Sequence, residues 1–209
     1  MIPVKVLAVR YLANASSALA QGLGAPKGYP SLAMLTTDCD DATYIALDAA
    51  TKVADVQVSY GRSFYAGAAN ASTPNAGEVI GILAGPTPGA VRSGMEAALG
   101  ALQRIGFEEV GGVPYLAHTV ASVGSFLAKE AGVSAGSAVA YLIAPPLEGM
   151  YAMDAALKAA DVKLCKLYAP PSETNFGGGL LSGTQSACEA ACAAFAQSVA
   201  EVARMPIEG

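Results

Sequence analysis

The side chains best suited to chemistry form the acidic run Asp38-Cys39-Asp40-Asp41, which lies between an apolar stretch and a helical pattern. Grouped carboxylates can bind a metal ion or another cation. The run lacks the spaced oxygen ligands and the glycine of a calcium-binding loop, so no metal is expected. Asp40 and Asp41 also stand where a helix should begin, and there they would cap N–H groups and complement the helix dipole. The sequence leaves both roles open.

No complete catalytic constellation accompanies this run. His118 is the only histidine, and its place in the alternating stretch YLAHTVA is typical of a structural residue. Gly22-Leu23-Gly24 lacks the preceding strand and the Lys-Ser/Thr pair of a phosphate-binding loop, and residues 61–64 do not form a nucleophile elbow. We therefore expect a protein that is not an enzyme and that needs no cofactor and no metal.

The composition excludes two further classes of protein. Only 14% of the residues are charged, the net charge is −5, and Lys and Arg do not cluster as nucleic-acid binding requires. No apolar run reaches 18 residues, and Lys5 and Arg10 interrupt the N-terminal one, so neither a membrane span nor a signal peptide is predicted. Cys188 and Cys192 share a predicted helix stripe with Phe195, which indicates core packing and reduced cytosolic thiols.

One ten-residue pattern occurs twice in the chain. LDAATKVADV spans residues 47–56, and MDAALKAADV spans residues 153–162. From Asp48 and Asp154 onward, D, A, A, K, A, D and V recur. A helix core needs the alanines but not the lysine, so the recurrence of Lys52 and Lys158 favours an interface role over a merely solvated one. A lysine can lay its apolar stem across a neighbour and donate to backbone carbonyls.

The repeat extends to the predicted secondary structure, because each half reads strand, strand, helix, strand, loop, strand, helix. The first half has strands at 4–11, 31–36, 56–60 and 78–84, a helix at 42–54 and a helix after Pro88. The second half has strands at 115–120, 138–143, 162–168 and 176–181, a helix at 148–161 and a helix ending near Arg204. We predict an α+β fold of two tandem domains, residues 1–106 and 107–209.

The repeated motif resembles the D-A-x-x-K-A-A-N-V helix of bacterial microcompartment (BMC) shell proteins. DCDDATYIALDAATK, AGEVIGILAGP, AYLIAPPLEGMYAMDAALKAADV and PPSETNFGGGLLSGTQSAC resemble the tandem-domain type from ethanolamine utilisation, and the likeness covers nearly the whole chain. The resemblance implies two circularly permuted BMC domains with antiparallel or mixed sheets flanked by helices. It also implies a homotrimer that forms a pseudo-hexagonal tile and joins other shell proteins edge to edge in the cytoplasm.

The resemblance also implies pores that control the passage of small polar metabolites, with ethanolamine, choline and propanediol pathways left open. Carboxylates at such a constriction attract an ammonium group. The pore and substrate-binding candidates are Asp40, Asp41, Phe64, Tyr65 and Glu78. Phe107 is the candidate gate of the central pore, and Lys52 and Lys158 are the candidate tile-edge contacts.

One alternative function fits the same sequence. Tandem α+β domains also build soluble regulatory proteins that bind small molecules, and sequence physics alone does not separate the two classes. Assembly separates them, because a shell tile forms trimers and then sheets whereas a regulatory protein stops at a discrete oligomer.

Overall fold

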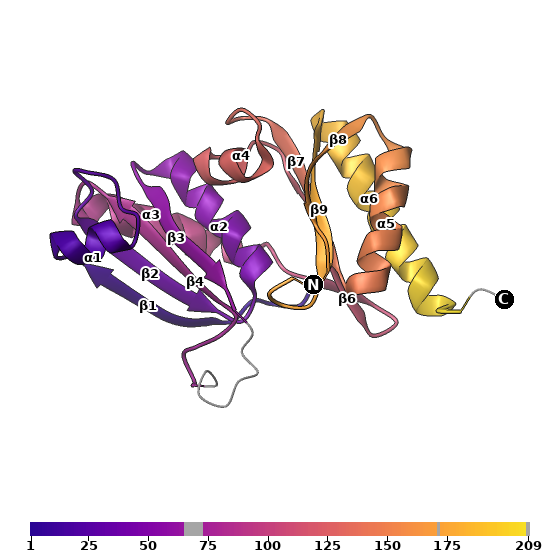
Figure 1. The fold of residues 1–209 in the computed structure, drawn as a ribbon, viewed down its shortest axis with the longest axis horizontal. Helices are drawn as coiled ribbons and strands as arrows, with labels where there is room; N and C mark the ends of the chain where they lie inside the picture. Colours follow the sequence, from indigo (N-terminus) through magenta and orange to yellow (C-terminus); the bar gives the residue numbers. More distant parts are fainter. Residues whose placement is uncertain (65–72, 171, 208–209) are drawn as a thin grey trace. The chain divides into compact units, whose positions relative to one another are not determined.

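The computed structural model describes residues 1–64, 73–170 and 172–207, which fall into two compact units (Figure 1). The first unit comprises Pro3–Ile105 together with Gly124–Leu127. The second unit comprises Met1–Ile2, Gly106–Val123 and Ala128–Gly209. Each unit has taken up a short segment from the other half of the chain, and the predicted domain boundary after residue 106 stays a prediction.

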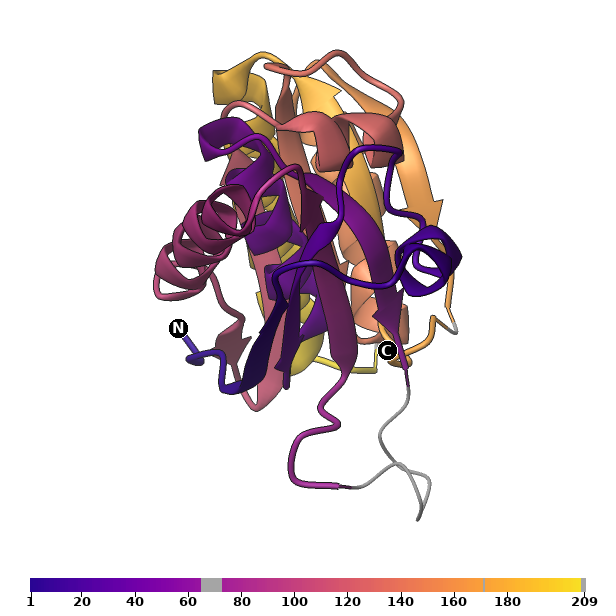
Figure 2. The same cartoon turned by 90° about the vertical axis from the view of Figure 1, so that its left-hand side faces the viewer.

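The first unit is built on an antiparallel sheet with the strand order β1-β2-β4-β3. Its elements are β1 (Val6–Leu12), α1 (Ser17–Gly22), β2 (Ser31–Thr37), α2 (Asp40–Val53), β3 (Gln57–Ser63), β4 (Val79–Gly85) and α3 (Pro88–Leu102). Helices α2 and α3 pack together and against the sheet, and Figure 2 shows α1 and α3 on opposite sides of it. On the α1 side, Leu23 and Tyr29 cover the buried Leu32 and Ile82.

The second unit repeats this plan with one strand added. Its sheet has the order β5-β6-β7-β9-β8, and α5 and α6 pack against it. Its elements are β5 (Glu108–Val110), β6 (Val113–Val120), α4 (Ser125–Ala131), β7 (Ala138–Ala144), α5 (Pro146–Ala159), β8 (Val162–Tyr168), β9 (Gly177–Gly183) and α6 (Gln185–Arg204). Helix α4 begins in the segment that belongs to the first unit. The predicted α+β repeat of antiparallel sheets flanked by helices is confirmed.

The two halves agree even in a local irregularity. The register of β3 on β4 shifts between Val58 and Tyr60, and that of β8 on β9 shifts between Leu164 and Lys166. These positions are 106 residues apart, which is also the spacing of the repeated motifs in α2 and α5. A bulge adds one residue to a strand and re-aims the side chains beside it. The shared bulge therefore lets us equate residues of β3 and β8 one by one.

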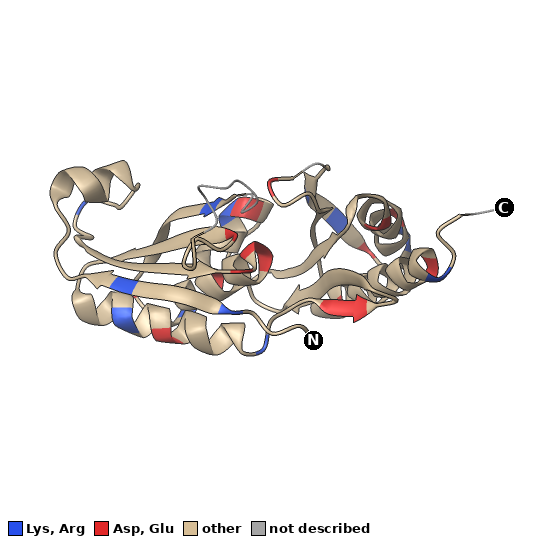
Figure 3. Ribbon diagram, turned by 90° about the horizontal axis from the view of Figure 1, so that it is seen from below, with Lys and Arg blue, Asp and Glu red and all other residues tan. Residues whose placement is uncertain are grey.

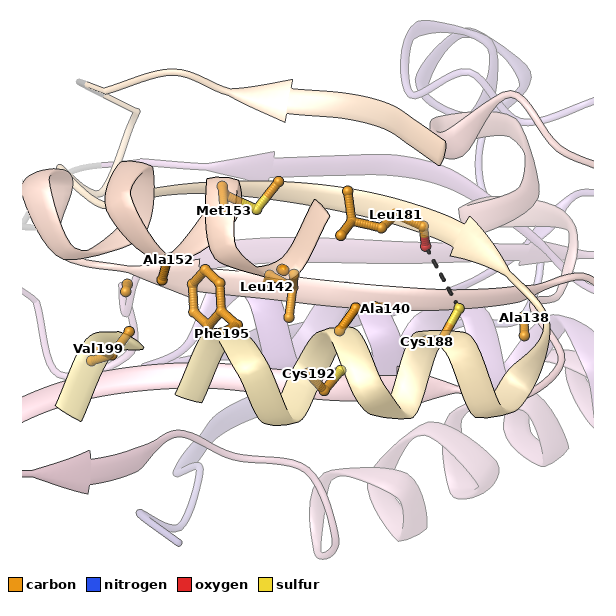
Figure 4. Close-up of a cluster of buried hydrophobic side chains, with 13 residues drawn as sticks. Ala138, Ala140, Leu142, Ala152, Met153, Leu181, Cys188, Cys192, Phe195 and Val199 are labelled. Atoms are coloured by element: carbon orange, nitrogen blue, oxygen red, sulfur yellow. Dashed lines mark hydrogen bonds between the residues drawn. The ribbon is translucent and has the colours of Figure 1, made fainter. Parts of the chain in front are cut away.

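The predicted cysteine stripe is confirmed as part of the core of the second unit (Figure 4). Cys188, Cys192, Phe195 and Val199 lie one turn apart on α6 and are buried. They pack with Leu142, Met153 and Leu181 of the neighbouring elements, as Figure 4 shows. The Cys188 Sγ lies 4.0 Å from the Leu181 carbonyl oxygen. These thiols act as small apolar side chains in this core.

The start of α2 differs from the sequence prediction. The helix begins at Asp40, and its N-cap is Cys39, whose side chain makes no capping hydrogen bond. The Thr37 hydroxyl accepts from the Cys39 N–H at 3.2 Å, while the Thr43 hydroxyl donates to the Cys39 carbonyl at 2.8 Å. These bonds fix Cys39 at the cap. Neither Asp40 nor Asp41 is the N-cap, and both lie in the first turn.

Helices α1 and α4 and strand β5 were not predicted from the sequence. Each is short, at six, seven and three residues, so its pattern covers too little chain to be distinctive. On helix α5, Tyr151 is 49% exposed although it lies in an apolar stretch of the sequence. Gly149, Ala152, Met153 and Ala156 are the buried positions instead. Small residues thus let α5 approach the sheet closely.

The described residues include no helix long and apolar enough to cross a membrane. Figure 3 shows the basic positions scattered over strands and helices of both units, in the part of the ribbon that is not grey.

Candidate functional site

The last residues of β2 and β3 and the first residues of β4 lie together at one end of the first sheet, where they position the acidic candidates. Strands β2 and β3 end opposite the start of β4, where Thr37 and Ser63 both pair with Val79. The Glu78 N–H donates to the Thr37 carbonyl at 2.8 Å, and the Phe64 N–H donates to the Glu78 carbonyl at 2.9 Å. The backbone therefore holds Phe64 and Glu78 side by side. Tyr65 lies outside the described residues.

Helix α2 begins at this same end of the sheet, so its first-turn residues Asp40 and Asp41 lie there too. Asp40 and Asp41 are each only 7% exposed, which is unusual for carboxylates. The Asp40 Oδ1 accepts from the Asp41 N–H at 2.8 Å, and the Ser63 hydroxyl is a further hydrogen-bond partner of the Asp40 carboxylate. The helix N-terminus also favours negative charge here. The acid is thus held in place by the helix and by β3.

A short polar relay leads away from Asp40. The Tyr44 hydroxyl lies 2.6 Å from the Ser63 hydroxyl, which in turn bonds to Asp40. Tyr44 also packs its ring against Phe126 at a centroid distance of 5.9 Å. An aromatic residue one turn along α2 therefore orients the serine that contacts the carboxylate.

Burial disfavours the ionised forms of the carboxylates at this site. Desolvation raises the pKa of Asp40 above its ordinary value, and the hydrogen bonds from Ser63 and Asp41 offset this only in part. The pKa of the half-buried Glu78 is raised chiefly by desolvation, and the nearby charges of Asp40 and Asp38 raise it further. Carboxylates that repel each other in this way attract a cation, which would relieve both effects.

The remaining residues of the acidic run are structural. The Asp38 Oδ1 accepts from the Lys5 N–H at 2.7 Å and so ties β2 to the chain before β1. Burial raises the pKa of the Cys39 thiol, and the neighbouring carboxylates add to the effect, so this thiol stays protonated. Among the described residues, no group of three or more His, Cys, Asp and Glu side chains is arranged to hold a metal ion.

The two recurring lysines have different surroundings. The Lys158 Nζ lies 2.6 Å from the Asp154 Oδ2, and both side chains are mostly exposed, at 74% and 65%. The Lys52 Nζ lies 3.8 Å from the Asp48 Oδ2, but Asp48 is completely buried. The Asp48 carboxylate accepts from the N–H groups of Gly124 and Leu127. Sequence reasoning missed this role of Asp48, since its partners lie more than seventy residues further along the chain.

The candidate gate residue lies in the second unit. The ring of Phe107 packs against that of Phe176, with centroids 5.8 Å apart. The Phe107 carbonyl also accepts from the Ile2 N–H at 2.6 Å. Phe107 thus stands just before β5 and Phe176 just before β9, with their rings in contact.

Comparisons with known proteins agree with this fold. The family model of the BMC domain matches residues 31–115. The bacterial microcompartment shell protein EutL of Clostridium perfringens (strain 13 / Type A) is 54% identical over 211 residues, which cover 99% of this chain and 97% of that protein. The crystal structure of ethanolamine utilization protein EutL from Leptotrichia buccalis C-1013-b matches with a TM-score of 0.95 at 55% identity, covering 100% of this chain and 98% of that chain. The trimeric bacterial microcompartment shell protein PduB shares the fold, with a TM-score of 0.79 at 18% identity over 96% of this chain and 89% of that chain.

Proposed function

The chain belongs to the bacterial microcompartment shell proteins of the EutL type, and from that premise we propose that its acidic site binds small cationic metabolites at a pore of the shell. Membership of this family sets aside the alternative of a regulatory binding protein. It also makes the role of the chain structural, in a shell that serves ethanolamine utilisation.

The observation that carries the proposed binding role is the grouping of Asp40, Asp41 and Glu78 where α2 and the strand ends meet. An ammonium ion has the opposite charge and donates three hydrogen bonds, so it can satisfy several carboxylate oxygens at once. Phe64 beside Glu78 adds an aromatic face, which favours a cation. Ethanolamine has both an ammonium and a hydroxyl group, and Ser63 offers a partner for the hydroxyl.

We further propose that the chain acts as a homotrimer, which joins other shell proteins edge to edge through Lys52 and Lys158. The fold neighbour PduB is a trimeric shell protein, and two tandem domains per chain give a three-chain tile six similar corners. The Phe107–Phe176 ring pair is the proposed gate of the central pore, since paired aromatic rings are bulky and exclude water. Acidic pores would pass a small cation and slow an uncharged aldehyde.

Titration calorimetry of the intact protein with ethanolamine tests the binding site. Glu78→Gln keeps the size of the side chain and removes its charge, so the affinity should fall about tenfold. Glu109→Gln on the exposed part of β5 is the matched control and should bind as the wild type does. Ethylene glycol, which replaces the ammonium with a hydroxyl, should not bind. Equal affinity in the wild type and in Glu78→Gln would reject Glu78 as part of the site.

A further inference from the structure

The hydrogen-bonded relay from Asp40 through Ser63 to Tyr44 occurs in only one of the two repeats. The spacing of 106 residues between the repeats gives each member a counterpart in the second unit, and no counterpart carries a hydroxyl or carboxylate group. The counterparts are Pro146 for Asp40, Met150 for Tyr44 and Ala169 for Ser63. The second unit forms the same helix and the same paired strands without these groups. The fold of a unit therefore does not require the relay.

The chemistry of the three groups sets the direction of the relay. An ionised carboxylate only accepts hydrogen bonds, so the single Ser63 hydroxyl proton is donated to Asp40. The Ser63 oxygen lies 2.6 Å from the Tyr44 oxygen and must then accept the tyrosine proton. A hydroxyl that accepts one hydrogen bond becomes a stronger donor in the next. Tyr44 thus strengthens the hydrogen bond that stabilises the negative charge of Asp40.

Two neighbours position the Tyr44 ring. The ring lies close to Gly61 of β3, where an added Cβ would be 3.2 Å from the Tyr44 Cε1. The Phe126 ring packs on it, with centroids 5.9 Å apart and planes inclined at 42°. Gly61 and Ser63 are two residues apart in one strand, so they lie on the same face of the sheet. A ring held over Gly61 therefore directs its hydroxyl to Ser63.

The ionisable groups around Asp40 are three carboxyl groups and a thiol. Asp41 follows it in α2, Asp38 and Cys39 precede the helix, and Glu78 precedes β4. Burial raises the pKa of Asp40, and the hydrogen bond from Ser63 is the largest of the effects that lower this pKa. Loss of that hydrogen bond would leave Asp40 protonated over a wider range of pH.

We propose that Tyr44 is a positioning residue of the acidic site and holds the Ser63 hydroxyl as a donor to the ionised Asp40 carboxylate. Tyr44 acts through Ser63 and has no need to contact the metabolite. The relay keeps the site charged at pH values at which a buried carboxylate without it would take up a proton. A charged site attracts a cation. This inference rests on the proposed binding of a cationic metabolite at this site and identifies what keeps the site ionised.

Calorimetry with ethanolamine at two pH values tests the relay. Tyr44→Phe keeps the ring that packs on Phe126 and removes only the hydroxyl. At about pH 8 Asp40 is ionised in either protein, so the variant should bind within about twofold of the wild type. At about pH 6 the variant should bind about fivefold more weakly, because its Asp40 is protonated at a higher pH.

Tyr29→Phe is the matched control. The Tyr29 hydroxyl also lies 2.6 Å from an oxygen atom, the Oδ1 of Asp55, which follows the far end of α2. This variant therefore loses an equally short tyrosine hydrogen bond outside the acidic site. Its affinity for ethanolamine should equal that of the wild type at both pH values. Circular dichroism checks that all variants are folded.

A double variant tests whether Tyr44 and Ser63 act together. Ser63→Ala removes the donor to Asp40 and should weaken binding at about pH 6 at least as much as Tyr44→Phe does. Groups that act through one another are not additive, so adding Tyr44→Phe to Ser63→Ala should cause no further loss. Losses that add would show that Tyr44 acts apart from Ser63, which would overturn the relay.

The remaining outcomes separate the relay from the site itself. A loss in Tyr44→Phe that is confined to the lower pH supports the relay. Wild-type affinity at both pH values, or the same fold-loss at both, overturns the relay and leaves the proposed site intact. A wild-type protein that does not bind ethanolamine at either pH overturns the proposed site, and the relay with it.

Discussion

The Asp48 carboxylate accepts the backbone N–H of Gly124 across a separation of 76 residues, at 2.7 Å. The same carboxylate accepts from Leu127, and the Thr51 hydroxyl accepts from the Ser125 N–H at 3.1 Å. Two side chains of α2 thus satisfy three of the N–H groups at the start of α4, which have no partner within their own helix. A helix normally takes such partners from its own cap, so this start is fixed by tertiary structure.

Removal of the Asp48 carboxylate should be costly for the fold. Asp48→Ala leaves two N–H groups without their acceptor and should lower the free energy of unfolding by about 2–4 kcal/mol. Urea denaturation followed by circular dichroism measures this. Asp161→Ala, at an exposed aspartate in the turn after α5, is the control and should change stability by less than about 0.5 kcal/mol. Equal losses in the two variants would contradict the role of Asp48.

Gly124 should tolerate no side chain. A Cβ at this position would lie 2.2 Å from the Thr51 Oγ1 and 2.7 Å from the Asp48 carbonyl oxygen. Gly124→Ala should therefore destabilise the protein by about 1–3 kcal/mol, as overpacking does. Gly100 in α3 has nothing within 4 Å of an added Cβ, so Gly100→Ala should stabilise the protein by about 0.5–1 kcal/mol. Thermal unfolding of both variants shows whether Gly124→Ala lowers the melting temperature while Gly100→Ala raises it.

Most of the fold could be predicted from the sequence repeat. The contacts between residues far apart in the sequence could not be predicted from it. The ten-letter repeat and the alternating strands located β2, α2, β8 and their neighbours because periodicity is a local property. Asp48 was not singled out, since a helix Asp with Lys four residues on reads as a surface pair, and that is what Asp154 and Lys158 are. Only the fold brings Gly124 to Asp48.

The acidic residues could be identified from the sequence because they stand out locally. Asp40 and Asp41 are adjacent in sequence, and Glu78 immediately precedes the apolar stretch VIGILA. The family resemblance joined them into one site, and the strand pairing brings the ends of β2, β3 and β4 together. Ser63 and Tyr44 were not predicted to support the site, because a serine and a tyrosine without a motif give no signal. Their hydrogen bond appears only when β3 lies beside α2.

Ethanolamine binding should weaken as the pH falls. Burial raises the pKa values of Asp40 and Glu78, and an ammonium ion favours their ionised forms. The ionised site is therefore lost as the pH falls through these raised values, which lie above the ordinary carboxyl range of about 4. Calorimetry at about pH 5 and about pH 8 should show the tighter binding at the higher pH. At the lower pH, binding should release protons. Calorimetry in buffers of different ionisation enthalpy measures this release. Affinity that is constant over this range would contradict a carboxylate site.

The core thiols should resist alkylation. Burial raises the pKa of Cys192 to about 11 and also raises that of Cys188, so very little thiolate is present near neutral pH. Iodoacetamide at about pH 8 should modify Cys192 at least about 100-fold more slowly in the folded protein than in urea. Peptide mass spectrometry over time gives the rate for each cysteine. Equal rates before and after unfolding would show that α6 does not bury these residues as described.

The tile edge can be tested most cleanly at Lys158. Its ion pair with Asp154 is exposed and contributes about 0–1 kcal/mol, so Lys158→Ala should leave folding and trimer formation unchanged. Lys52→Ala is less suitable, because it also removes a charge beside the buried Asp48 and should lower stability. If Lys158 lies flat across a neighbouring tile, negative-stain microscopy should show hexagonal sheets for the wild type and none for Lys158→Ala. Lys163→Ala, at an exposed lysine on β8, should still form sheets. If the Lys158→Ala variant is trimeric and still forms sheets, this lysine is not part of the edge contact. If the variant is trimeric but forms no sheets, Lys158 acts between trimers and not within them.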